Sequence, residues 1–183
     1  MTPHTYLFVD GSCGSGQDFG GWAAIVVAPK QRKILYGSVW PTTISRCELL
    51  PIVEGLRWIK SNWAVKQPAY SVVVVSDSEY TVKTLCGVYP RKKNMELWTA
   101  LDEAAKQLTI KYVWRERNSL PYMEFCDAIC GSFRRALIHG AIERFDAKYK
   151  EPEQDMPYGM LPATIDDAVL LQQGTEQHEQ DDE

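Results

Sequence analysis

The stretch VVVVSDSEYTV, residues 72–82, decides the predicted fold. Four consecutive valines are typical of a strand that is buried on both faces, as in a parallel sheet. Ser76 and Asp77 follow at once, and residues 78–82 have the composition of a helix start. A strand that runs into a helix is the unit of α/β folds, whose functional sites lie at the carboxyl ends of the strands. Asp77 is therefore either a helix cap or part of such a site.

The rest of the chain has the hydrophobic periodicity of an α/β domain. Alternating or continuous apolar runs predict strands, and apolar residues at helical spacing predict helices. The predicted strands are residues 5–10, 20–28, 33–40, 70–76 and 109–116, and the predicted helices are residues 45–63, 78–87, 94–108 and 122–145. Short turns make the first three strands an antiparallel meander, and the helix after them leads to a strand parallel to the first. Pro51 lies inside that helix, which is expected to start late or to bend there.

Charge is distributed unevenly along the chain. It carries 24 acidic residues against 20 lysines and arginines, a net charge of −4. Ten of the acidic residues and none of the basic ones lie from Glu151 onward, so residues 1–150 carry a net charge of +6. The pattern predicts a globular domain over residues 1–150 and an acidic, mostly disordered tail over residues 151–183. A basic domain suits an anionic partner such as nucleic acid, and the tail suits either a protein partner or solubility alone.

Composition argues against several other classes of protein. Apolar residues make up 45% of the chain and aromatic residues 11%, which is enough for a core. No apolar run approaches the roughly 20 residues of a membrane span. The first residues, Met-Thr-Pro-His, lack the features of a signal peptide, so a cytoplasmic protein is expected. The five cysteines form no Cys-x-x-Cys pair, which predicts reduced, mostly buried thiols rather than a disulfide framework or a zinc site.

Four carboxylates converge in the predicted fold. Asp10 ends the first strand and Asp77 follows the fourth, so both leave the same edge of the sheet if these strands are parallel neighbours. Glu48 lies one turn into the first long helix, and Asp127 lies in the first turns of the last one. Close carboxylates repel one another, and Mg²⁺, which prefers oxygen ligands, would relieve that repulsion. Two such ions about 4 Å apart can activate a water and stabilise the leaving oxygen of a phosphodiester.

Each of these acids, taken singly, also has a structural interpretation. Asp77 suits a helix cap, and Asp10 suits a turn. Glu48 suits a capping box with Ser45, and Asp127 suits a solvated helix surface. The joint placement of all four acids favours the metal cluster over these separate structural roles.

Five segments between residues 5 and 138 resemble, in order, the type 1 ribonuclease H enzymes of the RNase H-like fold. They are FVDGSC followed by GGWA, then TTISRCELL, VVSDSEYTV, NMELWTALDEA and MEFCDAIC. The second is similar to the family's Thr-Thr-x-x-Arg-x-Glu-Leu segment, and the last is similar to its Glu-x-Cys-Asp motif. The order and spacing of all five make the resemblance specific.

The resemblance implies a metal-dependent endoribonuclease that cleaves the RNA strand of RNA–DNA hybrids to 5′-phosphate and 3′-hydroxyl ends. It implies a mixed five-stranded sheet, with three antiparallel strands and then parallel ones, flanked by helices. The acids that match the family's ligands for two Mg²⁺ ions, or alternatively Mn²⁺, are Asp10, Glu48, Asp77 and Asp127. The matching segments also imply contacts with the nucleic acid at Gly11, Ser12, Cys13, Thr43, Ser45 and Arg46.

The sequence departs from the family pattern in two segments that would contact nucleic acid. Ile44 and Ser45 stand where the family commonly has two asparagines, which leaves recognition of 2′-hydroxyls weaker or to the backbone. The basic segment between the helices is reduced to GVYPRKKN. Its Arg91, Lys92 and Lys93 either contact phosphates or form a solvated turn.

A third departure concerns the loop after the fifth strand. Many family members carry a histidine there, and this loop, WRERNSLPYMEFCD, has none. Its RERN segment resembles an Arg-x-x-Asn pattern of some branches of the family. The candidate auxiliary residues are therefore Glu116, Arg117 and Asn118, with Glu116 taking the role of the histidine or Arg117 holding a phosphate.

Rival interpretations differ in what the fold would do. The same fold hosts other metal nucleases, such as junction resolvases and exonucleases. A binding module with a weak or inactive site is a second alternative, and a purely structural α/β protein is a third. Retention of four mutually repelling acids argues against the last two, and the match of TTISRCELL favours the hybrid-cleaving branch over other nucleases.

Overall fold

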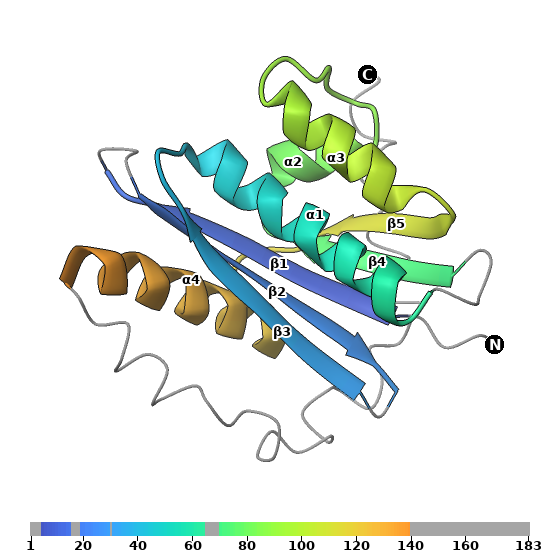
Figure 1. Cartoon of the computed structure of the whole chain (residues 1–183), viewed down its shortest axis with the longest axis horizontal. Helices are drawn as coiled ribbons and strands as arrows, with labels where there is room; N and C mark the ends of the chain where they lie inside the picture. The colour runs from blue at the N-terminus through green and yellow to red at the C-terminus, as the bar shows by residue number, and fades with distance from the viewer. Residues whose placement is uncertain (1–4, 16–18, 30, 65–69, 140–183) are drawn as a thin grey trace, which may run out of the picture. The chain divides into compact units, whose positions relative to one another are not determined.

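A computed structural model describes residues 5–15, 19–29, 31–64 and 70–139, which are the coloured parts of Figure 1. The elements follow the predicted order along the chain, and β2 and β4 have the predicted bounds. They are β1 (Thr5–Cys13), β2 (Gly20–Ala28), β3 (Gln31–Val39), α1 (Ile44–Asn62), β4 (Tyr70–Ser76), α2 (Glu79–Leu85), α3 (Met95–Ala105), β5 (Leu108–Trp114) and α4 (Pro121–His139).

The strands form one mixed sheet in the order β3-β2-β1-β4-β5. The pairs β1–β2 and β2–β3 are antiparallel, whereas β1–β4 and β4–β5 are parallel. This arrangement confirms the predicted sheet. In the β1–β4 pair Val9 stands opposite Ser76, so the next residue of each strand, Asp10 and Asp77, lies at the same edge.

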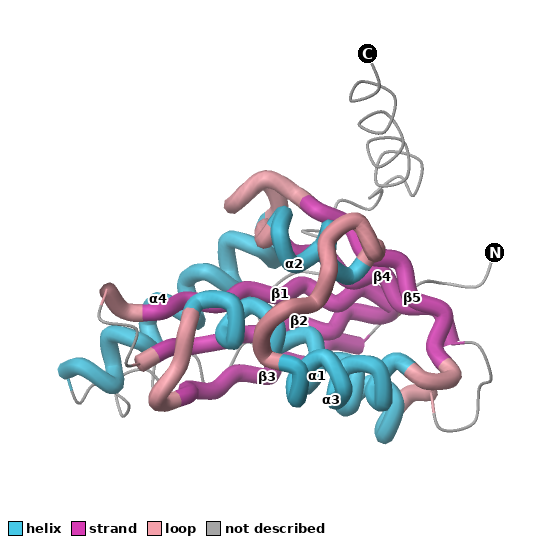
Figure 2. Tube along the Cα trace, turned by 90° about the horizontal axis from the view of Figure 1, so that it is seen from above, coloured by secondary structure: helices cyan, strands magenta, loops and turns pink. Residues whose placement is uncertain are grey.

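Helices cover both faces of the sheet, with α1 and α3 on one face and α4 on the other (Figures 1 and 2). Successive side chains of β1 point to opposite faces of the sheet, so the strand packs against helices on both faces. Leu7 packs against Gly55 of α1, where an added Cβ would lie 2.5 Å from a Leu7 methyl carbon. Phe8 points the other way and stacks on Tyr122 of α4, with ring centroids 5.0 Å apart. The valine run 72–75 is buried, as predicted for a strand covered on both faces.

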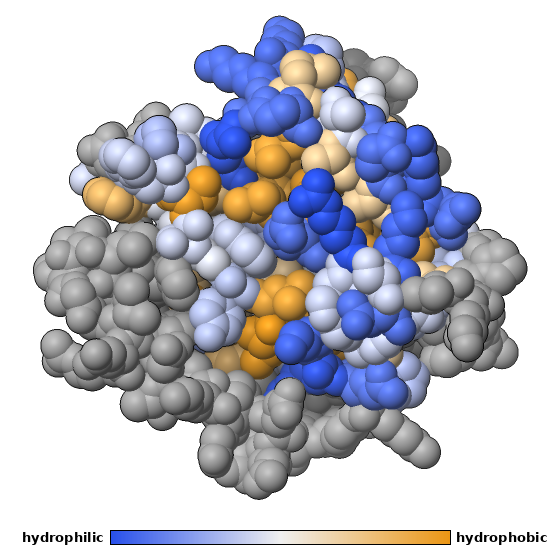
Figure 3. Space-filling view, in the orientation of Figure 1, coloured by the Kyte–Doolittle hydropathy of each residue, from blue (hydrophilic) through white to orange (hydrophobic). Residues whose placement is uncertain are grey.

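The larger core lies between the sheet and the helices α1 and α3. It is built from aliphatic residues of the central strands and of α1, closed by Trp98, Leu101 and Ala104 of α3. In the space-filling view hydrophilic residues dominate the outer side of these helices, and hydrophobic residues show between them (Figure 3). Packing of this kind fixes the ends of β1, β4 and α1 relative to one another, which matters for the site at those ends.

The first turn of α1 approaches the end of β1 unusually closely. The helix begins at Ile44, so of the two alternatives expected for Pro51, a late start or a bend, the late start does not occur. Pro51 has no N–H to donate to the carbonyl of Cys47, four residues earlier. Gly11 of β1 lies against that same carbonyl, and an added Cβ there would be 2.3 Å from both the carbon and the oxygen. The contact brings Glu48, the next residue of α1, beside the end of β1.

Several bounds differ from the predictions for identifiable reasons. β1 continues past residue 10 because Gly11, Ser12 and Cys13 pair with the start of β2. α3 ends at Ala105, three residues early, because Gln107 adopts a positive φ of 70° that no helix continues through. The predicted end of the last helix, residues 140–145, and the predicted tail, residues 151–183, lie outside the described residues.

The five cysteines lie within the described residues, where none forms a disulfide, and three of them are buried. Cys126 and Cys130 share the face of α4 that packs on the sheet, and their thiols donate to the carbonyls of Phe8 and Asp10 at 3.5 and 3.2 Å. Among the helices of the described part of the chain, none combines the length and the apolar character that crossing a membrane requires.

Candidate active site

Asp10 and Asp77 stand side by side at one edge of the sheet. Asp10 belongs to β1, where it pairs with Ala23 of β2, and is therefore a strand residue and not a turn residue. Asp77 directly follows β4, and its carbonyl accepts a hydrogen bond from the indole of Trp114 at 3.1 Å. Because β1 and β4 are parallel neighbours, both carboxylates leave the sheet together, as the sequence predicts.

Glu48 reaches the same place from α1. Its carboxylate accepts hydrogen bonds from the hydroxyls of Ser78 at 2.6 Å and Thr81 at 3.3 Å. α1 starts at the cap residue Thr43, so Glu48 is too far into the helix for the capping box suggested by its spacing to Ser45. The hydroxyls of α2 instead orient Glu48 toward the sheet edge.

The cap of α2 is Ser78, not Asp77. The Ser78 hydroxyl accepts the N–H of Thr81 at 3.4 Å and donates to Glu48. Asp77 is thereby left without a capping role. The structural interpretations of Asp10, Glu48 and Asp77 are therefore wrong, and these three acids meet at one place.

Asp127 completes the group from α4, on the other side of the sheet edge. It is half-buried, and its Oδ1 accepts a hydrogen bond from Nη2 of Arg117 at 2.8 Å. Nε of Arg117 lies 3.6 Å from Oδ2 of Asp77. The guanidinium therefore bridges Asp77 and Asp127, which the sequence did not predict. The sequence had indicated Arg117 only as a loop residue of the RERN segment that could hold a phosphate.

Asp10 is the most deeply buried of the acids, with 6% of its surface exposed. Its Oδ1 accepts the N–H of Gly11 at 2.8 Å, whereas its Oδ2 is buried and has no hydrogen-bond partner within the described structure. Burial raises the pKa of Asp10 to about 7, with further contributions from the negative charges of Asp77 and Asp127. A buried carboxylate oxygen without a partner is costly unless a cation or a proton joins it.

Burial also raises the pKa values of Glu48 and Asp77, and nearby groups partly oppose the rise. Burial raises the pKa of Glu48, and the hydrogen bonds from Ser78 and Thr81 oppose that rise. Burial also raises the pKa of Asp77, while the positive charge of Arg117 opposes it. Perturbed carboxyl groups at the end of parallel strands are the expected feature of a functional site rather than of a solvated surface.

The residue types at this edge fit a divalent metal ion that prefers oxygen ligands. The unpartnered oxygen of Asp10 and the mutual repulsion of the acids both favour a cation there. The fit is one of composition, because no group of three or more acid, histidine or cysteine side chains in the described residues is already arranged to hold a metal ion. Arg117 forms ion pairs with two of these acids, Asp77 and Asp127.

The residues expected to contact nucleic acid differ in their surroundings. Gly11, Ser12 and Cys13 form the end of β1. Thr43 is exposed at the start of α1, where its side chain makes no cap hydrogen bond, and Ser45 follows in the first turn. Those positions stay predictions, since the structure shows only that they flank the acids.

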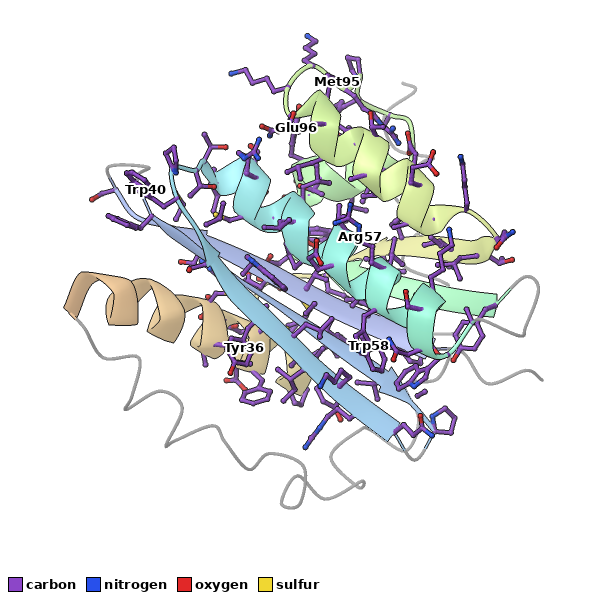
Figure 4. The ribbon with its side chains drawn as sticks, viewed as in Figure 1. Tyr36, Trp40, Arg57, Trp58, Met95 and Glu96 are labelled. Carbon is purple, nitrogen blue, oxygen red and sulfur yellow. The ribbon has the colours of Figure 1, made fainter. Side chains whose placement is uncertain are left out.

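Arg46 and Arg91 are both tied to α3. Arg46 forms an ion pair with Glu96 and lies 3.4 Å from the side-chain oxygen of Asn94; Glu96 is labelled in Figure 4. Arg91 pairs with Asp102 at 2.6 Å and lies 4.7 Å from the ring of Trp98. Phosphate contacts by either arginine would have to replace or share these interactions.

The remaining predicted contacts are exposed. Lys92 and Lys93 project from the segment before α3, and Glu116 and Asn118 flank Arg117 in the loop before α4. Asn118 has a positive φ of 55°, a conformation that asparagine tolerates well. Of the three loop residues proposed as auxiliaries, the structure shows contact with the acids for Arg117.

Two pairs of exposed aromatic residues were not singled out from the sequence. Tyr80 of α2 is 51% exposed and stacks on Tyr89, with centroids 5.8 Å apart and with Lys83 5.8 Å above the Tyr89 ring. Phe19 stacks on Trp40 at 6.0 Å, and Trp40 projects from the end of β3 near the start of α1 (Figure 4). Such pairs need tertiary structure to be recognised, because their partners lie 9 and 21 residues apart.

The sheet order, the helices on both faces and the acids at one edge define the RNase H-like class of α/β proteins. The RNase H family model matches residues 2–128. A ribonuclease H of Cupriavidus metallidurans is 36% identical over 137 residues, which cover 67% of this chain and 90% of the relative. A ribonuclease H of Wolbachia pipientis is 31% identical over 139 residues, covering 72% of this chain and 94% of the relative. The chain therefore belongs to the RNase H family and is a hydrolase of the ribonuclease H class.

Solved structures agree on the fold. The N-terminal RNase H domain of a Mycobacterium tuberculosis protein superposes with a TM-score of 0.64 at 20% identity, covering 76% of this chain and 99% of that one. LC11-RNase H1, solved in complex with an RNA/DNA hybrid, gives a TM-score of 0.58 at 17% identity, covering 73% of this chain and 99% of that one. At these identities the likeness concerns the fold alone.

Proposed function

We propose that this protein is a metal-dependent endoribonuclease that cleaves the RNA strand of RNA–DNA hybrids, leaving 5′-phosphate and 3′-hydroxyl ends. The observation that supports the proposal is the electrostatic interaction of Asp10 with Asp77 and Asp127, and of Glu48 with Asp77, together with a buried Asp10 oxygen that has no hydrogen-bond partner in the described structure. The family membership and the hybrid bound by LC11-RNase H1 support the choice of substrate.

The four acids are the residues that would hold divalent metal, either Mg²⁺ or Mn²⁺. When bound, a pair of such ions supplies Lewis-acid activation of water and of the leaving oxygen. Asp10 contributes the unpartnered oxygen, and its position is fixed by its place in β1 and by the N–H of Gly11. Ser78 and Thr81 hold Glu48 in place, and Trp114 anchors the backbone of Asp77. The chain itself thus supplies the orientation of the ligands.

The hybrid is proposed to lie across the sheet edge, between the start of α1 and α2. The proposed surface includes the end of β1 with Thr43 and Ser45, and the Tyr80–Tyr89 pair with Lys83. Aromatic rings next to a cation are a common surface for stacking against nucleic acid, and Lys92 and Lys93 would add salt-dependent contacts with phosphates. The net charge of +6 on residues 1–150 supports an anionic partner.

The proposal is tested by cleavage of a substrate series with Mg²⁺. End-labelled RNA–DNA hybrid is compared with single-stranded RNA, duplex RNA, duplex DNA and a four-way DNA junction. We expect products from the RNA strand of the hybrid alone, ending in 3′-hydroxyl groups, and none with EDTA. Cleavage of the junction or of duplex DNA would show a different nuclease on the same fold, and tight binding without cleavage would show a binding module.

Two finer assignments belong to the same proposal. A cytoplasmic location suits an enzyme of nucleic acids, and fractionation of cells that express the chain tests it. The acidic residues 151–183 are proposed to serve solubility or a protein partner. Both assignments are independent of the chemistry at the sheet edge.

A further inference from the structure

Arg117 places a guanidinium among the four acids. It donates to Asp127 at 2.8 Å and lies 3.6 Å from Asp77. Its positive charge also lowers the pKa of Asp10 and of Glu48 against the effect of burial. Arg117 is therefore a counter-cation for the whole acid group and not for one partner.

The oxygens that Arg117 contacts are the same ones that a metal ion would need. Oδ1 of Asp127 and Oδ2 of Asp77 face the guanidinium, whereas Oδ2 of Asp10 has no hydrogen-bond partner in the described structure. A divalent ion and a guanidinium cannot occupy the space between two carboxylates at once, because both are cations and both need the same lone pairs.

The side chain of Arg117 is also placed so that it can move away from the carboxylates into solvent. Its side chain is 61% exposed and lies on the loop between Trp114, the end of β5, and Pro121, the start of α4. Its neighbours Glu116 and Asn118 are exposed as well. Rotation of the guanidinium into water would uncover the carboxylates without opening the core, since the side chain makes no part of it.

We propose that Arg117 is a displaceable counter-cation, which occupies Asp77 and Asp127 in the metal-free protein and gives up Asp127 when a divalent ion binds. Arg117 thereby weakens metal binding and neutralises the site in the absence of metal. The inference rests on the proposed function in one respect, namely that the acids bind divalent metal. It adds that Arg117 competes with the divalent ion for the carboxylates of Asp77 and Asp127.

The test is titration of the full chain with Mg²⁺ by calorimetry, without nucleic acid. The variants are Arg117→Gln, which removes the charge, and Arg117→Lys, which keeps a charge but cannot bridge two carboxylates through a planar fork. Lys111→Gln is the matched control, since it removes an exposed positive charge on β5 away from the acids. We expect the dissociation constant of Arg117→Gln to fall about three- to fivefold, the upper part of the range for an exposed ion pair. Arg117→Lys should lie between Arg117→Gln and the unsubstituted protein.

A second readout separates competition from a general effect of net charge. In EDTA at neutral pH, Arg117→Gln should unfold at a lower temperature than the unsubstituted protein, because its acids repel one another without relief. Mg²⁺ should then raise its unfolding temperature by more than it raises that of the unsubstituted protein. An equal gain in metal affinity for Lys111→Gln, or unchanged affinity for Arg117→Gln, would overturn the inference.

The outcomes also distinguish this inference from the proposed function. If the unsubstituted protein binds Mg²⁺ and Arg117→Gln binds it equally well, the competition is absent and the metal site stands. If neither protein binds Mg²⁺ or Mn²⁺ at millimolar concentration, both the competition and the metal-dependent function fail.

Discussion

Gly11 is the residue on which the geometry of the site depends most directly. Its backbone packs against the carbonyl of Cys47, the group that Pro51 leaves without a helix partner. Asp10 precedes Gly11 and Glu48 follows Cys47, so the close contact of the two backbones sets the separation of two acids. Only a residue without a Cβ fits there.

Gly11→Ala is therefore expected to destabilise the protein. The new Cβ would lie 2.3 Å from the Cys47 backbone, which cannot yield as the end of a side chain can. We expect a loss of roughly 2 kcal/mol or more in the free energy of unfolding, measured in urea. Gly14→Ala is the control, since its nearest neighbour, the carbonyl oxygen of Phe19, would be 3.6 Å from the new Cβ, an ordinary contact. Equal stability of the two variants would contradict this account of the contact.

Asp10 gives the metal-free protein a characteristic dependence of stability on pH. Burial and the charges of Asp77 and Asp127 raise its pKa from 3.8 to about 7. The folded protein then holds a proton that the unfolded chain has released, so this group's contribution to stability falls as the pH rises from about 4 to about 7. Above pH 7 the charged carboxylate remains buried and repelled by its neighbours.

Asp10→Asn should remove that penalty. In EDTA at pH 8 we expect the variant to be more stable than the unsubstituted protein by on the order of 1 kcal/mol or more. The difference should vanish toward pH 4, where Asp10 is protonated in the folded protein and resembles asparagine. Urea unfolding at a series of pH values measures it, and a difference that does not change with pH would show that Asp10 titrates normally.

At the scale of elements, the short helix α2 contributes both to the orientation of Glu48 and to an exposed aromatic pair. Its cap, Ser78, and the next turn, Thr81, orient Glu48, while its outer side carries Tyr80, stacked on Tyr89 beyond the helix end. One short helix thus links the acid group to the aromatic surface proposed to bind nucleic acid.

That surface predicts the effect of Tyr89→Ala on binding. Loss of a stacking ring should raise the dissociation constant for an RNA–DNA hybrid by roughly 5- to 10-fold, the lower part of the range for base stacking on an aromatic side chain. Tyr36→Ala is the matched control, because Tyr36 is similarly exposed on the edge strand β3, away from α2 (Figure 4). Binding is measured by fluorescence anisotropy in Ca²⁺ to avoid cleavage. Equal effects of the two variants would remove α2 from the proposed interface.

Most elements could be predicted from the sequence because their signals are local. The valine run marks β4, and the period of apolar residues marks α1 despite Pro51. The bounds that the sequence missed depend on distant partners or on single dihedral angles. The extension of β1 depends on its pairing with β2, and the early end of α3 on the positive φ of Gln107.

The shared position of Asp10 and Asp77 was predictable for a different reason, which belongs to the fold as a whole. Once β1 and β4 are placed as parallel neighbours, their carboxyl ends must coincide, and so must Asp10 and Asp77. The bridge from Arg117 and the hydroxyls on Glu48 were not predictable, because they depend on side-chain rotamers in loops and caps. The interactions of Arg46 and Arg91 with α3 were missed for the same reason.

At the scale of the whole molecule, the distribution of charge is consistent with a polyanionic substrate and a cation-binding site. Residues 1–150 carry a net positive charge, although the candidate site within them is rich in acids. A polyanion would be attracted by the outer charges, while the acids need cations to accept its phosphates. Arg117 supplies one cation in the metal-free protein, and divalent metal is proposed to supply the others during the reaction.

The central claim, that the four acids form one catalytic site, is tested most directly by cleavage of an end-labelled RNA–DNA hybrid in Mg²⁺ with matched variants. Asp10→Asn and Glu48→Gln each remove one acid of the group, whereas Glu54→Gln removes an acid of the same helix that pairs with Arg57 at the surface. The account predicts that the first two lose at least about a hundredfold in rate while Glu54→Gln cleaves normally. Full activity of Asp10→Asn or Glu48→Gln would contradict it.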